Sequence, residues 1–259
     1  MAGRKASGDK RRGIQSVEIG LRVLSAVAQP REPSSLSAIA QNSGLSASQA
    51  HRYLSSLMAS GMVKQEGRSG QYDLDFGAIQ IGLAALARID PFALADDAFR
   101  LLSRETKRTH LVAVWGEGGP VIVRWFPGDP PVVTSLAIGS TLPVLQSATG
   151  RIFFAFAEGA LIRDRVKKEA RRIGRPVGDF TPLREEILKE MVAHVEGDLI
   201  PGLRAVAAPV FDLQGRLVFA VSSIANANFA EEEDESAKLA LVGACRSLTE
   251  SLGGRWPEA

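Results

Sequence analysis

Residues 35–74 constrain the fold of this chain more than any other segment, because they spell two short helices followed by two short strands. Apolar residues recur at helical spacing over 36–40, and Ser43-Gly44 then breaks the pattern. Ser46 and Gln49 precede the next apolar pattern at the spacing of a capping box, in which two side chains satisfy backbone donors at a helix start. The segment therefore predicts a helix-turn-helix.

The second helix of this pair has one apolar and one polar face. The side chains expected to be buried are Ala50, Tyr53, Leu54 and Leu57. The outward set contains no acid and is short or hydrogen-bonding: Ala47, Ser48, Gln49, His51 and Arg52. Such a face suits the DNA major groove, where the first turn of a recognition helix reaches base edges. We take Ser46, Ser48, Gln49, His51 and Arg52 as candidate DNA contacts, and capping competes with base reading at Gln49.

A two-stranded wing follows the helix pair. Residues 62–65 and 71–74 alternate with period two, and the glycine-bounded loop 66–70 between them is long enough for a hairpin. Arg68 stands at the tip of that loop. It contacts phosphate, enters a minor groove or is simply solvated, and we include it among the candidate DNA contacts.

Charge is divided unevenly along the chain. Residues 1–80 carry ten Lys or Arg against six Asp or Glu, whereas the remaining residues carry 21 against 23. A basic front end is typical of a protein that meets nucleic acid at one end only. The clusters Arg4-Lys5 and Lys10-Arg11-Arg12 are either a flexible arm that adds phosphate contacts or a solvated terminus with no role.

Length and composition set wider bounds. A chain of 259 residues with 45% apolar content and no apolar run of about 18 residues predicts a two-domain globular protein without a membrane span. No apolar core follows the basic N-terminus, so we expect no signal sequence. The single cysteine, Cys245, fits a cytoplasmic location and lies in an apolar helical pattern, where a buried inert thiol is expected.

A helix that is apolar nearly all round is expected over 76–89, before Asp90-Pro91. Packing against the same helix of a second chain would bury this helix and make a homodimer with two DNA-binding domains. The alternative is that the helix packs against the second domain of its own chain. The expected organisation is a flexible basic arm at 1–12, a winged helix-turn-helix at 13–75, a linker helix at 76–90 and a second domain at 91–259.

The second domain mixes helices and strands, so the expected fold class is α+β. Its predicted strands cover 110–115, 121–126, 132–137, 205–211 and 217–224. Its predicted helices cover 91–109, 147–157, 161–173, 181–195 and 230–252. The economical assembly is an antiparallel sheet of five or six strands backed by helices, which can hold a small ligand on one face.

Taken together, these segments resemble the IclR-type transcriptional regulators over nearly the whole chain from Gly13. In the first domain the resemblance is carried by Gln15–Leu24, Gly44-Leu45, His51–Leu54 and Gly70–Leu74. In the second it is carried by Gly139–Pro143, Ser147–Arg151 and Pro201–Asp212. The motifs are specific in combination and in order, although none is specific alone.

The resemblance implies a winged helix that reads palindromic double-stranded operator DNA and a GAF-like domain that binds a small organic acid, aromatic or short aliphatic. It also implies a homodimer or homotetramer, no cofactor and no metal. The effector contacts that it implies are Ser147, Ala148, Thr149, Leu203, Ala205 and Ser222, with Glu196 or Asp198 as an acidic neighbour. Exposed N–H groups at the helix start near Ser147 would form the anion site.

Several positions depart from the family pattern. Arg151 stands where the family usually has Lys, Leu145-Gln146 replaces a His-Ala pair, and Ala205 replaces a small polar or sulfur residue. These changes indicate a more apolar pocket. Ala47 and Gln49 replace the usual Lys and Thr, which would alter the choice of operator.

The alternatives are an enzyme or ligand-binding protein whose appended winged helix binds protein rather than DNA. No metal-spaced His/Cys group, nucleophile elbow or phosphate-binding glycine loop occurs in the sequence, so we expect no catalytic residues. His110 and His194 are isolated, and we expect His194 near a helix end.

Overall fold

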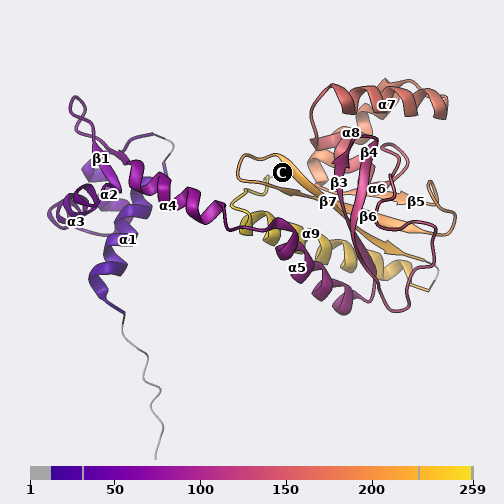
Figure 1. Cartoon of the computed structure of the whole chain (residues 1–259), viewed down its shortest axis with the longest axis horizontal. Coiled ribbons are helices and arrows are strands. Elements are labelled where there is room, and N and C mark those ends of the chain that lie inside the picture. Colours follow the sequence, from indigo (N-terminus) through magenta and orange to yellow (C-terminus); the bar gives the residue numbers. More distant parts are fainter. Residues whose placement is uncertain (1–12, 31, 227, 258–259) are drawn as a thin grey trace, which may run out of the picture. The chain divides into compact units, whose positions relative to one another are not determined.

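The computed structural model describes residues 13–30, 32–226 and 228–257. These fall into two compact units, of which the first ends at Ile89 and the second begins at Asp90 (Figure 1). The expected arm at 1–12 lies outside these residues. Within them no single helix is long and apolar enough to cross a membrane; the helices Phe76–Leu86 and Pro91–Thr106 pass that test only as a pair bent by 54°.

The first unit is a winged helix-turn-helix. Its elements are α1 (Gln15–Ala28), α2 (Leu36–Ser43), α3 (Ala47–Ala59), β1 (Val63–Gln65), β2 (Tyr72–Leu74) and α4 (Phe76–Leu86). Gly44 ends α2 at a φ of 69°, a left-handed conformation that favours glycine, and the chain turns there into α3. The predicted capping box of Ser46 and Gln49 is confirmed. A core around Val23, Ile39, Leu54 and Tyr72 holds the helices on the wing.

Helix α4 is unlike the other helices of this unit, because none of its residues is buried. Its large apolar side chains are 39–64% exposed: Phe76, Ile79, Ile81, Leu83 and Leu86. Asp75 caps its start by accepting a hydrogen bond from the N–H of Phe76. The helix therefore offers apolar surface that the described residues leave uncovered.

The second unit is built on a five-stranded antiparallel sheet in the order β4-β3-β7-β6-β5. Its strands are β3 (Thr109–Gly116), β4 (Gly119–Phe126), β5 (Ala193–Glu196), β6 (Arg204–Phe211) and β7 (Leu217–Ala225). Its helices are α5 (Pro91–Thr106), α6 (Ala148–Phe156), α7 (Ala160–Ile173), η1 (Val177–Phe180), α8 (Thr181–Glu190), η2 (Glu231–Glu233) and α9 (Asp234–Ser251). The α+β fold class is confirmed.

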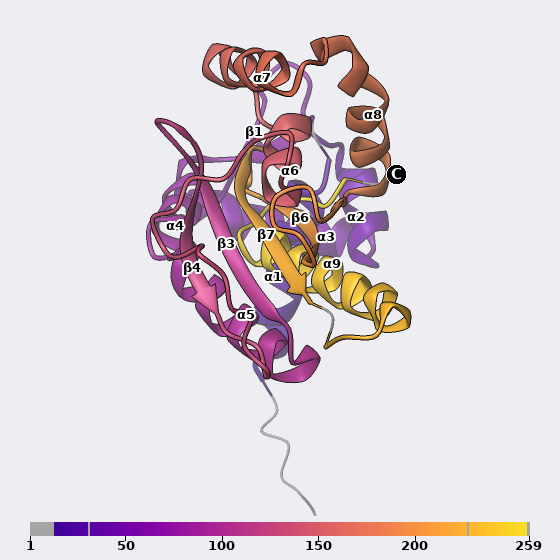
Figure 2. The same cartoon turned by 90° about the vertical axis from the view of Figure 1, so that its right-hand side faces the viewer.

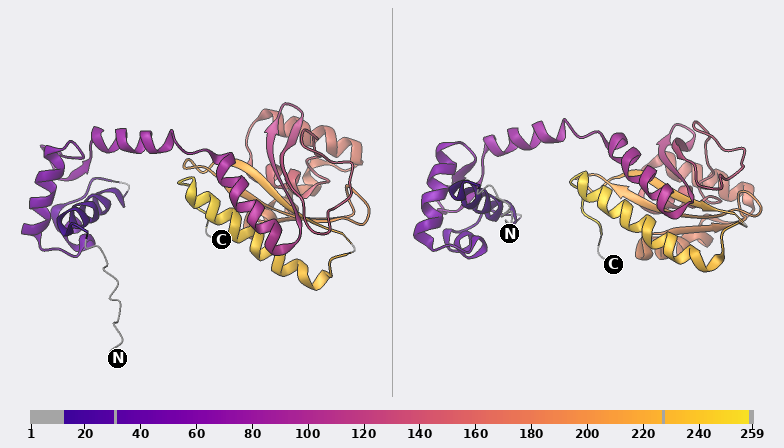
Figure 3. Two further views of the ribbon diagram at one scale, coloured as in Figure 1. Left: turned by 60° about the horizontal axis from the view of Figure 1, so that its bottom comes forward. Right: turned by 90° about the horizontal axis from the view of Figure 1, so that it is seen from below.

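The helices cover both faces of this sheet (Figures 2 and 3). Helices α5 and α9 lie side by side on one face, and α6 packs on the other with α8 beside it and α7 at the outer edge. The main apolar core lies between α6 and the sheet and includes Leu111, Ile152, Phe153 and Ala207. Strand residues alternate between the two faces, so neighbouring positions on β3 and β7 serve different layers.

Two sequence predictions about this unit are wrong. Residues 132–137 form no strand, because residues 139–142 take the edge position beside β4: Ile122 donates to the carbonyl of Ser140, and Leu142 donates to that of Pro120. The helix expected over 181–195 ends at Glu190, where Met191 adopts a φ of 59°. Residues 193–196 then alternate buried and exposed as β5, so His194 lies on a strand rather than at a helix end.

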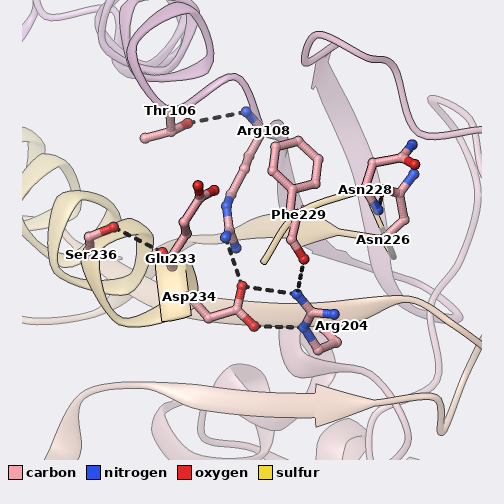
Figure 4. Close-up of polar contacts among 9 residues, drawn as sticks. All are labelled: Thr106, Arg108, Arg204, Asn226, Asn228, Phe229, Glu233, Asp234 and Ser236. Atoms are coloured by element: carbon pink, nitrogen blue, oxygen red, sulfur yellow. Dashed lines mark hydrogen bonds and ion pairs between the residues drawn. The ribbon is translucent and has the colours of Figure 1, made fainter. Parts of the chain in front are cut away.

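A cluster of charged side chains fastens the start of α9 to the sheet (Figure 4). Asp234 lies between two arginines, with its Oδ1 2.7 Å from Nη2 of Arg108 and its Oδ2 2.6 Å from Nε of Arg204. Arg204 also donates to the carbonyl of Phe229. Burial alone would raise the pKa of the Asp234 carboxyl, but the Arg204 and Arg108 guanidinium groups lower it. The cluster joins the α5–β3 turn, β6 and α9.

Candidate functional site

The outward face of α3 carries the predicted recognition residues. Ser46, Ser48, Gln49, His51 and Arg52 are all exposed, while Ala50 and Leu54 on the opposite face are completely buried. The structure thus brings these candidates together on one solvent-facing surface without an acidic side chain. A surface of this composition can approach DNA without electrostatic repulsion.

Gln49 is turned back toward the start of its own helix. Its Oε1 accepts hydrogen bonds from the backbone N–H of Ser46 at 3.2 Å and from the Ser46 hydroxyl at 3.1 Å. Of its two expected roles, capping is the one seen in the structure. Reading an adenine would require Gln49 to leave the cap.

Arg68 lies exposed in the loop between β1 and β2. In the part of the chain that the structure describes, neither Arg68 nor Arg52 lies within 4.0 Å of a carboxylate, whereas Lys64 pairs with Asp73 across the wing. Both guanidinium groups are therefore free to meet phosphate.

The second unit contains a cavity between the start of α6 and the sheet. Six of the predicted effector contacts line it: Ser147, Ala148, Thr149, Leu203, Ala205 and Ser222. Apolar side chains that the sequence reasoning did not single out complete the wall: Leu111, Leu136, Leu142, Val195, Leu199, Ile200 and Ile224. No charged side chain from the described ranges lines the cavity.

The polar end of the cavity is the N-terminus of α6. Ser147 caps the helix, since its hydroxyl accepts from the N–H of Gly150 at 2.9 Å and donates to the carbonyl of Pro143. The hydroxyls of Thr149 and Ser222 are 2.6 Å apart and almost fully buried. Within the described part of the chain, the N–H groups of Ala148 and Thr149 have no acceptor. Unsatisfied donors at the positive end of a helix attract an anion.

The cavity is small and its wall includes a turn with glycines on either side. Its volume of about 40 Å³ holds a few water molecules. Leu199 and Ile200 lie in a turn between Gly197 and Gly202, both with positive φ, and Leu203 follows this turn directly. A molecule with more than a few heavy atoms therefore requires this turn to move.

The two acidic candidates lie outside the cavity wall. Glu196 is exposed on β5 and lines a separate cavity on the α9 side of the sheet. Asp198 accepts a hydrogen bond from Nη2 of Arg151 at 2.7 Å. Arg151 also donates to the carbonyls of Leu145 and His194. Asp198 thus fastens the turn that forms one wall of the cavity to α6.

Glu169 of α7 has a structural role that the sequence reasoning missed. Its carboxylate is 5% exposed and accepts hydrogen bonds from the N–H groups of Val144 and Leu145, which lead into α6. A signal was present, because Glu169 lies on the apolar face of α7 at helical spacing from Ile162 and Val166. Glu169 therefore holds the segment that presents Ser147.

His110 and Cys245 are both buried, and neither lines the cavity beside α6. His110 is buried, its Nδ1 lies 2.8 Å from the Ser103 hydroxyl, and burial lowers its pKa to about 4, so it is neutral at pH 7. Cys245 is fully buried, and burial raises the pKa of its thiol. Among the described residues no cluster of His, Cys, Asp or Glu is arranged to hold a metal ion.

Each of the two units matches a known protein family. Residues 16–67 match the IclR helix-turn-helix domain, and residues 83–249 match the family described as bacterial transcriptional regulator IclR C-terminal. The HTH-type transcriptional regulator KdgR of Escherichia coli (strain K12) is 25% identical over 93% of each chain. The glycerol operon regulatory protein of Streptomyces griseus is 30% identical over 81% of this chain and 84% of its own.

Solved structures point the same way. The crystal structure of Pseudomonas aeruginosa HmgR has 31% sequence identity and a TM-score of 0.83, covering 93% of this chain and 99% of that one. These relatives favour the DNA-binding reading of the winged helix over the protein-binding alternative. The chain belongs to the IclR family and is a DNA-binding transcriptional regulator with a C-terminal effector-binding domain.

Proposed function

We propose that the cavity beside α6 binds a small organic acid and that its occupation changes the affinity of the winged helix for operator DNA. The observation that carries this proposal is the free N–H pair of Ala148 and Thr149 at the end of an otherwise apolar cavity. A carboxylate would accept from these donors and from the hydroxyls of Thr149 and Ser222. The apolar body of the acid, aromatic or short aliphatic, would lie against the leucines.

Binding such an acid requires the turn over 197–203 to open. A cavity for a small ligand has a volume of about 300 Å³ or more, far above the present one. The pair of Arg151 and Asp198 holds the turn closed, and the flanking glycines permit a change of backbone conformation. Opening and closing of this turn would link the cavity to α6 and the sheet.

A thermal-shift screen of carboxylic acids tests this assignment. An acid that binds only the folded protein raises the melting temperature by mass action. We expect acids of the matching size to raise it and their uncharged amides to leave it unchanged, because an amide lacks the negative charge that the helix N-terminus favours. Equal shifts from acids and amides would contradict an anion site.

In the DNA-binding unit, we propose that Ser46, Ser48, His51 and Arg52 of α3 face the major groove and that Arg68 contacts the backbone. Gln49 joins them when DNA displaces it from the cap. The winged helix at 13–75 connects through a linker helix at 76–90 to the effector-binding domain at 91–259. The proposed location is the cytoplasm, where such a regulator meets DNA.

Arg52→Ala is expected to weaken DNA binding for all sequences, because an exposed arginine on α3 neutralises a phosphate. The slope of log affinity against log salt should fall by about one. Fluorescence anisotropy with labelled upstream DNA over a salt series measures both quantities. Arg22→Ala on α1 removes an equally exposed cation and serves as the control. An Arg52→Ala protein with unchanged affinity and slope would refute the assignment.

The chain is expected to be at least a homodimer in solution, with a homotetramer as the larger alternative. Four apolar side chains of α4 are more than half exposed: Phe76, Ile79, Ile81 and Leu83. A second copy of α4 would cover them and hold two winged helices for a palindromic operator. Light scattering should give a dimer or larger, and Ile81→Glu with Leu83→Glu should lower the mass. A monomer of the unaltered chain at working concentration would contradict this prediction.

A further inference from the structure

Helix α7 of the effector-binding unit is strongly basic. Its 14 residues contain six Lys or Arg and two acids, although residues 81–259 as a whole are slightly acidic. Five of the cations are exposed: Arg163, Lys167, Lys168, Arg171 and Arg172. The helix lies at the outer edge of its unit (Figures 1 and 2).

Few of the cations of α7 have an acidic partner among the described residues. Arg165 pairs with Glu169, and Arg172 reaches Gln146 at 3.3 Å. Arg163, Lys167 and Lys168 have no carboxylate within 4.0 Å in the described part of the chain. The positive surface therefore remains available to a partner.

The arrangement also opposes the stability of the helix itself. Like charges four residues apart repel, and α7 has three such pairs: Arg163 with Lys167, Lys167 with Arg171, and Lys168 with Arg172. Arg163 stands in the first turn, where the helix dipole disfavours a cation. The dipole favours only Arg171 and Arg172 at the opposite end. Asp164, at a favourable spacing four residues before Lys168, offsets only part of this repulsion, and a bound polyanion would offset the rest.

We infer that α7 is a second DNA-contacting surface, which binds the phosphate backbone without reading sequence. The inference rests on the proposed reading of DNA by α3. DNA is the polyanion that the first unit of this chain binds, and its phosphate backbone has the charge that complements the cations of α7. An acidic protein segment is the competing partner. The cations are spread around the exposed surface of α7 rather than gathered in a pocket, which favours DNA because contacts to phosphates do not require a shaped pocket.

The test uses the full chain and a long labelled duplex of random sequence. In the α7 variant, Arg163, Lys167 and Lys168 are replaced by Gln. In the control variant, Arg100, Arg104 and Arg246 are replaced by Gln, which removes the same charge from exposed positions on α5 and α9. The salt slope of binding should fall by about two to three in the α7 variant and stay near its original value in the control.

The melting temperature reports whether the α7 variant folds, and the salt slope reports whether it has lost DNA contacts. The α7 variant should melt no lower than the unaltered chain, because the substitutions remove like-charge repulsion. If Arg52→Ala lowers the slope while the α7 variant matches its control, the α7 assignment is overturned and the role of α3 stands. If the unaltered chain binds no duplex even at low salt, the proposed DNA reading fails with it.

Discussion

Asp234→Asn is expected to lower the free energy of unfolding of the effector-binding unit by about 3 kcal/mol, the scale for removing one partner of a buried charge pair. Arg108 is 3% exposed and Arg204 is 19% exposed, and both depend on the same carboxylate (Figure 4). The neutral amide removes the carboxylate that pairs with both guanidinium groups, and Arg108 is the more deeply buried of the two. Urea unfolding followed by tryptophan fluorescence measures the effect, because all three tryptophans lie in this unit.

Asp96→Asn is the matched control for this experiment. Asp96 is 32% exposed and Asp234 is 33% exposed, but the partner of Asp96, Arg124, is 37% exposed rather than buried. The control should cost about 1 kcal/mol or less. Equal costs for the two variants would contradict the importance of burial at Arg108.

The lowered pKa of Asp234 also makes the stability of this unit depend on pH. Because the pKa of Asp234 is lower in the folded protein than in the unfolded chain, its contribution to stability is complete above the unfolded pKa of about 4. That contribution is lost as the pH falls through the folded value. Asp234→Asn should remove this part of the acid destabilisation.

Ala148→Pro is expected to abolish the response to the effector while α6 remains folded. Proline removes the N–H of the first residue of α6, one of the two free donors at the cavity. The first helical position tolerates proline, and Ser147 before it has the extended conformation that proline requires, with φ of −122° and ψ of 147°. The measurement is operator binding during titration with the acid found by thermal shift.

Ser222→Ala is the graded comparison for that experiment. It removes the hydroxyl that lies 2.6 Å from that of Thr149 and should weaken binding of the acid by about 1 kcal/mol, the usual scale of one hydrogen bond. Operator affinity without the acid should survive both substitutions. A fully responsive Ala148→Pro protein with native circular dichroism would place the effector site elsewhere.

The local elements of this protein were predictable from its sequence. The α2–α3 turn is encoded by Gly44 and by the capping pair of Ser46 and Gln49, which act within a few residues of each other. Strand β5 was missed because Met191 ends α8 in a left-handed conformation that a non-glycine residue seldom signals. The strand expected over 132–137 did not form, since the position beside β4 is decided by tertiary pairing and not by strand propensity.

In the candidate sites, too, local motifs were predictable from the sequence, whereas features that depend on tertiary contacts were not. The start of α6 was placed by its motif, and the structure brings Ser147, Thr149 and Ser222 together across many intervening residues. Four of the five leucines of the cavity wall come from loops, whose positions depend on the folded sheet: Leu136, Leu142, Leu199 and Leu203. The roles of Arg151 and Asp198 as a fastening pair are also tertiary, because their residues are 47 positions apart.

The most direct test of the account measures binding of the full chain to labelled upstream DNA in the presence and absence of each acid that raises its melting temperature. We expect salt-dependent binding of a DNA fragment and a change in that affinity when the acid is added, reversed by removing it. DNA affinity that no stabilising acid changes would contradict the central claim that the cavity beside α6 controls the winged helix.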